Sequence, residues 1–328
     1  MKNPREVFLN NSSQSQPIRW LTETPAVEAA ALRGALTEIR HSCGAFEWVT
    51  FLYLAWLQAV LLFFHRNVTH AAPLFAIHSA VAIGIICIAL VAARTKNAIA
   101  RFARDWYPLP LYIGFFEELE RLVHAIFPGW FDRWLIEFDY GFGGIHPSIW
   151  LARFASPAMN EFMQFSYMTY FLYLVLLPAI LYANKDRLAY WTVMVSTAVA
   201  HYSVYVIAVL LPIQSPYHAL PSLETNPLPG GWCTATIDFI ERFARVRGAA
   251  FPSAHVAGSM VALLAAYRYR RWLFWVTLPF FLSMCVATVY GRYHYVADVL
   301  AGIVVGAVGY IVGSLLMERK GALAKIAE

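Results

Sequence analysis

Seven long stretches of the chain contain no Asp, Glu, Lys or Arg, and this pattern limits the folds that the chain can adopt. Most of them approach the length of about 20 apolar residues that spans the hydrocarbon core of a bilayer. A lipid-exposed backbone must satisfy its own hydrogen bonds, so most of these stretches predict a helix. We therefore expect an all-α fold, a polytopic membrane helical bundle of about 6–8 transmembrane helices. The stretches are Trp48–Phe64, Ala71–Ala93, Phe162–Asn184, Leu188–Tyr217, Gly248–Tyr267, Trp272–Gly291 and Val299–Met317.

Composition indicates lipid rather than water as the surrounding medium. The 328 residues are 59% hydrophobic and 14% charged, whereas soluble domains carry about 25% charged residues. The net charge of +5 is accounted for by Lys and Arg in cytoplasmic loops, so nucleic acid is not an expected partner.

Basic clusters orient the helices, because Lys and Arg are enriched in cytoplasmic loops. If every cluster faces the cytoplasm together with the N-terminal tail, the chain crosses about eight times and both termini are cytoplasmic. The third crossing, within 107–127, stays open, because its acidic residues are costly in lipid; an interfacial or re-entrant helix is the alternative. The clusters lie at Arg94–Arg104, Lys185–Arg187, Arg268–Arg271 and Arg319–Lys320.

One membrane domain accounts for most of the chain. Residues 1–45 are polar and lack the apolar core of a signal peptide, so they predict a cytosolic tail. We expect residues 46–320 to form a single transmembrane domain, the one that holds the candidate site residues, and 321–328 to form a C-terminal tail. Two segments rich in Gly, Pro and aromatic residues, near 128–157 and 212–250, predict ordered structure on the outer surface.

Two histidines fall near the same end of a predicted helical hairpin. The Arg268–Arg271 cluster marks a tight turn, with His255 before it and His294 after it. At 1.5 Å per residue they lie about 20 Å and about 34 Å from the turn. We expect the two side chains to converge toward the outer face, with His255 more deeply recessed unless helix tilt or an unwound helix end makes up the difference.

The residues around these histidines suit attack on an electrophile. Pro252 and Ser253 favour a helix start, whose free amides bind anions. Asp298 is four residues from His294 on one helical face, so its carboxylate can accept from one imidazole N–H and leave the other nitrogen free to attack. His255 can protonate a departing alkoxide. We predict His294, His255 and Asp298 as catalytic and Ser253 as phosphate-binding.

Cations to hold phosphate are less clearly marked. Arg292 is the strongest candidate because it lies next to His294; Arg245 and Arg247 precede the Ser253 segment, and a solvated helix face is their alternative. A metal site built from the three catalytic residues lacks a HExxH pair or a carboxylate cluster. We expect neither a metal nor another cofactor.

Other features suit structural roles. We interpret His65, His78 and His201 as satisfied core residues. Gly302/Gly306 and Gly309/Gly313 are small-xxx-small pairs that favour close helix packing.

The segment Pro252-Ser253-Ala254-His255, followed by His294-Tyr-Val-Ala-Asp298-Val-Leu-Ala-Gly, resembles the second and third signature motifs of the type 2 phosphatidic acid phosphatase superfamily. The resemblance implies that His294 forms phosphohistidine, with Asp298 as its partner and His255 as the general acid. Ser253 and nearby amides would hold the phosphate oxygens.

The chain also departs from the phosphatase pattern. Ala254 replaces the usual Gly, Thr288 stands where an Arg is expected, and no Lys-x6-Arg-Pro first motif is present. These departures are similar to the inositol phosphorylceramide synthase (inositolphosphotransferase) branch. Further stretches resemble the same branch: 104–118, 132–147 and 211–216.

We therefore expect an integral membrane lipid phosphotransferase or phosphatase with its active site on the extracytoplasmic side. Its partners would be membrane lipids, as lipid-phosphate substrate and as hydroxyl acceptor. The alternatives are a plain lipid phosphate phosphatase with water as acceptor and, from another class, a transporter or lipid-binding protein with an inert site. Oligomeric state is left open.

Overall fold

The computed structural model describes residues 20–220, 228, 230–244 and 246–327. It divides the chain into two units, Met1–Ser42 and Cys43–Glu328. Helix α1 (Trp20–Ser42) is the described element of the first unit. All regular elements described in the second unit are helices, and Ile213 and Ala249 form an isolated β-bridge. The predicted all-α fold is confirmed.

Six helices of the second unit are long and apolar enough to cross a membrane, so the chain is a multi-pass membrane protein. The sequence predicts about eight crossings, and the difference lies in two shorter helices. α5 (Pro108–Leu122) has 15 residues and α13 (Ala254–Tyr269) has 16, which gives at most about 24 Å against a bilayer core of about 30 Å. The six are α2 (Ala45–Phe64, continued by the 3₁₀ helix η1, His65–Asn67), α3 (Ala71–Arg94), α8 (Pro157–Ala183), α9 (Arg187–Leu210), α14 (Arg271–Tyr290) and α15 (Val296–Ala327).

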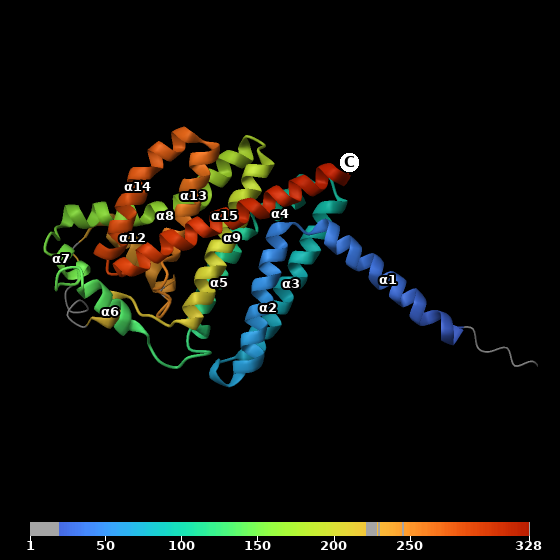
Figure 1. Cartoon of the computed structure of the whole chain (residues 1–328), viewed down its shortest axis with the longest axis horizontal. Coiled ribbons are helices and arrows are strands. Elements are labelled where there is room, and N and C mark those ends of the chain that lie inside the picture. The colour runs from blue at the N-terminus through green and yellow to red at the C-terminus, as the bar shows by residue number, and fades with distance from the viewer. Residues whose placement is uncertain (1–19, 221–227, 229, 245, 328) are drawn as a thin grey trace, which may run out of the picture. The chain divides into compact units, whose positions relative to one another are not determined.

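Helix α13 is enclosed by other helices of the bundle. Most of its residues are small or β-branched and buried, and α8, α9, α14 and α15 pack around it. Figure 1 shows α13 and α14 as an orange pair, with the red α15 running across α9 and α13. A helix covered by protein does not need to match the thickness of the bilayer, because its neighbours replace lipid contact.

The glycines of α15 allow this close packing, as predicted. A Cβ atom on Gly302 would lie 2.8 Å from the carbonyl oxygen of Ser253, and one on Gly306 would lie 2.5 Å from that of Ala257. Both distances are shorter than carbon–oxygen contacts allow, so only glycine fits there without a shift of α13. The second pair of glycines faces α9 in the same way: Gly309 and Gly313.

Paired charges join helices near the end of the bundle that carries Arg187. Asp105 lies in α4 (Ala98–Trp106) and accepts two hydrogen bonds of 2.7 Å from Arg187 of α9. Glu47 of α2 accepts from Arg104 of α4 at 3.1 Å. Both carboxylates are buried, and pairing with a guanidinium offsets their loss of hydration.

The two predicted outer segments contain short helices that pack on the long ones. α6 (Asp132–Tyr140) contacts α15, α7 (Pro147–Ala152) contacts α14, and α12 (Trp232–Ala244) contacts α8. The segments meet where the Phe131 N–H donates to the Pro212 carbonyl at 2.9 Å, shortly before α10 (Pro216–Ala219). Residues 221–227, 229 and 245 lie outside the described residues.

The domain boundaries and the side of the membrane stay predictions. Helix α1 occupies much of the predicted N-terminal tail, and α15 continues through the predicted C-terminal tail to Ala327. Neither observation assigns a terminus to the cytoplasm.

The glycine packing predicts a position-dependent cost of adding a single methyl group. Gly306→Ala should destabilise the protein by about 1–3 kcal/mol, because α15 must move away from α13. Gly84→Ala is the matched control: a Cβ there meets nothing within 4 Å, and alanine favours a helix over glycine by about 1 kcal/mol. Thermal unfolding in detergent measures both. Equal midpoints for the two variants would contradict the packing described here.

Candidate active site

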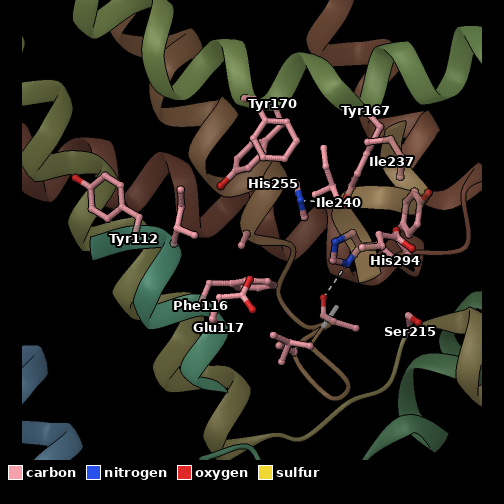
Figure 2. A pocket seen from close by; sticks show the side chains of 18 of the residues that line it. Tyr112, Phe116, Glu117, Tyr167, Tyr170, Ser215, Ile237, Ile240, His255 and His294 are labelled. Atoms are coloured by element: carbon pink, nitrogen blue, oxygen red, sulfur yellow. Dashed lines mark hydrogen bonds between the residues drawn. The ribbon is translucent and has the colours of Figure 1, made fainter. Parts of the chain in front are cut away.

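A cavity of about 400 Å³ lies between α5, α8, α12 and the first turn of α13. Its wall is mostly apolar and aromatic, and both predicted catalytic histidines line it (Figure 2). Asp298 and Ser253 are fully buried beside these histidines and do not reach the cavity. The structure thus brings the two histidines together at one cavity, with Asp298 and Ser253 behind them.

The His294 ring is held so that one nitrogen is left for the cavity. Nδ1 lies 2.9 Å from the carbonyl oxygen of Ala250 and 3.3 Å from Oδ2 of Asp298. A carbonyl oxygen can only accept, so Nδ1 carries the proton and donates it. In the neutral ring Nε2 is then unprotonated, and no described residue forms a hydrogen bond with it.

The loop between α14 and α15 sets the depth of His294. α14 ends at Tyr290, and Arg292 takes a left-handed conformation with φ of 67°. The N–H groups of Tyr293 and His294 then both donate to the carbonyl of Thr288, at 3.0 and 3.1 Å. The chain therefore turns back toward α14, which counting residues along a straight helix cannot anticipate.

The unwound end of α14 thus reduces the difference in depth that straight helices would give the two histidines. The ring centroids of His255 and His294 are 5.8 Å apart. A phosphorus atom between the two rings would be within reach of both.

Asp298 connects the loop before α15 to α15 itself and to the start of α13. Its Oδ2 accepts from the Tyr295 N–H at 2.7 Å, which caps the first turn of α15. Its backbone carbonyl accepts from the Ser253 N–H at 3.1 Å. One residue thus connects the segment of His294 to the start of the helix that carries His255.

The general-acid candidate has a partner that the sequence did not reveal. The hydroxyl of Tyr167, on α8, lies 2.9 Å from Nε2 of His255. Nδ1 of His255 is buried and has no hydrogen-bond partner among the described residues. Tyr167 is one of many tyrosines in apolar stretches, so no sequence signal distinguishes it.

The start of α13 provides free amides at the cavity. The Ser253 hydroxyl oxygen accepts from the Val256 N–H at 3.3 Å, so Ser253 caps the helix as predicted. The amides of Ala254 and His255 have no acceptor within the described part of the chain, and both residues line the cavity. Helix N-termini of this kind bind anions through such amides.

The model of the PAP2 superfamily matches residues 133–312, more than half of the chain. The matched region contains His255, His294 and Asp298. The chain belongs to the PAP2 superfamily. No curated protein and no solved structure matches it significantly. Membership places this membrane protein among phosphatases and phosphotransferases that act on lipid phosphates.

Arg292 and Arg247, the two described arginines that were predicted to hold phosphate, do not line the cavity of this PAP2 superfamily protein. Arg292 is buried, its carbonyl accepts from the Tyr217 N–H at 3.1 Å, and burial lowers the pKa of its guanidinium. Arg247 is exposed and lies over the ring of Trp130, 5.7 Å from the centroid, whereas its neighbour Val246 faces the cavity. Arg245 lies outside the described residues. The structure therefore does not bring Arg247 to the site, because its side chain extends away from it.

The other singled-out histidines lie apart from the cavity. His201 is fully buried, with Nδ1 donating to the Thr197 carbonyl at 3.0 Å and Nε2 meeting the Tyr170 hydroxyl at 3.0 Å. His78 is also buried and pairs with Glu118 at 2.6 Å. His65 is exposed at the end of α2, so its interpretation as a core residue is wrong.

Asp139 of α6 is a second supporting residue that the sequence did not reveal. Its carboxylate accepts from the N–H groups of Val296 and Ala297, at 3.0 and 3.4 Å. A carboxylate at a helix N-terminus is favoured by the helix dipole, although burial raises the pKa of Asp139. It thereby fixes the start of α15, directly after the loop of His294.

Removal of the Asp139 carboxylate should loosen this segment. Asp139→Ala is expected to speed hydrogen exchange across 294–299 and to cost about 0.5–2 kcal/mol, the usual effect of losing a helix cap. Glu137→Ala on the same helix is the control, because its exposed pair with Arg133 contributes about 0–1 kcal/mol. Hydrogen exchange read by mass spectrometry compares the two. Unchanged exchange in Asp139→Ala would refute the positioning role.

Proposed function

We propose that this PAP2 superfamily protein transfers or hydrolyses lipid-linked phosphate through a phosphohistidine on His294, without a metal. One observation carries the proposal. Nδ1 of His294 is hydrogen-bonded to the carbonyl of Ala250 and the carboxylate of Asp298. Nε2, beside the cavity, therefore keeps a free lone pair. A neutral imidazole fixed in this tautomer is a competent nucleophile at neutral pH.

The first half of the reaction uses both histidines. The Nε2 lone pair of His294 attacks phosphorus, the P–N bond forms, and the bond from phosphorus to the lipid oxygen breaks. Protonated His255 gives its proton to the departing alkoxide. Asp298 stabilises the positive charge that develops on the His294 ring, and the amides of Ala254 and His255 stabilise the phosphoryl oxygens.

The second half reverses these roles. His255 is now neutral and accepts a proton from the incoming hydroxyl, whose oxygen attacks phosphorus. The P–N bond breaks, and His294 returns to its starting state. The same residues serve a water or a lipid hydroxyl as acceptor.

A membrane lipid fits the walls of the cavity. Ile113 of α5 and Phe171 of α8 line it and are also exposed on the helix surface. These apolar side chains are suited to contact acyl chains, so a lipid can approach from the bilayer rather than from water.

A lipid hydroxyl is the preferred acceptor, with water as the alternative. The mostly apolar wall disfavours water around a reactive phosphohistidine, and the departures at Ala254 and Thr288 are similar to the inositol phosphorylceramide synthases, which transfer a phospho-headgroup between lipids. We place the site on the extracytoplasmic side, because His255 and His294 lie at the opposite end of α13 and α14 from Arg268, Arg270 and Arg271.

The proposed nucleophile has a direct test. His294→Gln should abolish transfer of label from ³²P-lipid phosphate to the protein and lower turnover by at least about a thousandfold. The exposed His65→Gln is the control and should behave as wild type. The assay contains EDTA and scores both free phosphate and headgroup exchange in mixed micelles. Full turnover by His294→Gln would refute the mechanism, and loss of wild-type activity in EDTA would refute its independence of metal.

The contact between Tyr167 and His255 predicts a dependence on the leaving group. Tyr167→Phe should reduce turnover of an alkyl phosphate by about 10- to 100-fold, because a poorly positioned acid cannot protonate the alkoxide. An aryl phosphate such as p-nitrophenyl phosphate needs no proton on its leaving group, so its turnover should fall less than about threefold. Equal losses on both substrates would mean that Tyr167 supports the fold and not the acid.

A further inference from the structure

The α5 side of the cavity, which lies away from His294 in Figure 2, carries the carboxylate of Glu117. Glu241 of α12 also lines the cavity, and no Lys or Arg from the described residues does. An anion would be repelled there. The phosphoryl group therefore belongs at the histidine end, and another group of the substrate must occupy the acidic end.

Glu117 has no hydrogen-bond or salt-bridge partner within the described part of the chain. It follows Ile113 by one helical turn and Phe116 by one residue, and all three line the cavity. Figure 2 shows Phe116 and Glu117 on the α5 side, with His294 on the other side in this view. A half-buried carboxylate among apolar side chains loses hydration without compensation, unless a ligand supplies a donor.

An independent observation at the histidine end also requires a ligand. The residue His294 is 5% exposed, and its Nε2 faces the cavity without a hydrogen-bond partner among the described residues. Two polar groups thus face one mostly apolar cavity. His294 can attack phosphorus, whereas Glu117 can bind a cation or accept a hydrogen bond.

Tyrosines of the wall contribute ring faces more than hydrogen-bond donors. The Tyr112 hydroxyl donates to the Met194 carbonyl at 2.7 Å, and the Tyr205 hydroxyl donates to the Tyr112 carbonyl at 3.0 Å. The Tyr170 hydroxyl meets His201. These three tyrosines can therefore offer a ligand their ring faces, and aromatic faces beside carboxylates attract an alkyl ammonium.

We propose that this acidic and aromatic wall binds the ammonium group of a zwitterionic phospho-headgroup, such as phosphoethanolamine or phosphocholine. The inference rests on the proposed function and names its donor lipid. His294 forms the P–N bond, the bond from phosphorus to the diacylglycerol oxygen breaks, and His255 protonates diacylglycerol. The headgroup stays on phosphorus and passes to the acceptor hydroxyl, whose proton returns to His255.

The carboxylate of α5 lies outside the region that matches the superfamily model. The matched region begins at residue 133, and α5 ends at Leu122. The catalytic histidines lie inside the match and Glu117 lies outside it, so substrate selection and phosphoryl chemistry reside on different parts of the chain.

The test compares substrates of different headgroup charge. Purified wild type and Glu117→Gln are assayed with phosphatidylethanolamine, phosphatidylglycerol and phosphatidic acid in mixed micelles. Glu117→Gln should lower kcat/KM for phosphatidylethanolamine by at least about tenfold, because a charge-assisted contact is lost. Its kcat/KM for the two anionic lipids should stay level or rise, since repulsion is relieved. Glu117→Asp should recover part of the loss, and Asp238→Asn, on the exposed face of α12, should match wild type.

The outcomes separate this inference from the proposed function. If the wild type turns over no lipid, the proposed function fails. If it turns over phosphatidic acid but Glu117→Gln leaves the ratio between the lipids unchanged, the ammonium site is refuted while the phosphohistidine stands. A wild-type preference for phosphatidylglycerol over phosphatidylethanolamine would also refute it, in favour of hydroxyl recognition.

Discussion

The contact between α15 and α13 is the constraint on which the site depends. At Gly302 the backbones approach so closely that a Cβ would collide with the Ser253 carbonyl. This proximity lets the Ser253 N–H reach the Asp298 carbonyl, and the same Asp298 accepts through its side chain from Tyr295 and His294. Helices in lipid gain little from hydrophobic association, so backbone proximity and buried hydrogen bonds must hold them together. Small residues in α15 are thus a condition for the chemistry and not only for the fold.

The sequence predicted the features that depend on local pattern. Uncharged stretches specify helices, because lipid offers the backbone no hydrogen-bond partners and a helix satisfies its own. The spacing of His294 and Asp298 specifies a shared helical face. The sequence could not predict features that arise where a loop reverses the direction of the chain. The loop after α14 bends back to Thr288 through Arg292 in a left-handed conformation, and arginine carries no signal for that turn.

Supporting residues were missed for a related reason. Tyr167 and Asp139 are 88 and 157 residues from the groups that they contact at His255 and Val296. Periodicity and capping rules describe neighbours in sequence and say nothing about such partners. Arg247 shows the converse: proximity in sequence to Ser253 suggested a role in the site, but the side chain extends toward Trp130. The distance along the chain is a poor guide to spatial proximity where a short loop joins two helices.

The distribution of charge around the cavity explains how one site could treat two parts of a lipid differently. Phosphate oxygens need donors, and the described wall offers them as amides of Ala254 and His255 rather than as arginines. Amide donors at a helix start are fixed and cannot turn away, so they act only where the phosphoryl group sits. Carboxylates elsewhere in the cavity then discourage phosphate from binding in any other place. An arginine reaching into the same cavity would neutralise Glu117 and remove this distinction. The absence of described Lys and Arg side chains from the wall therefore favours one orientation of the lipid over its reverse.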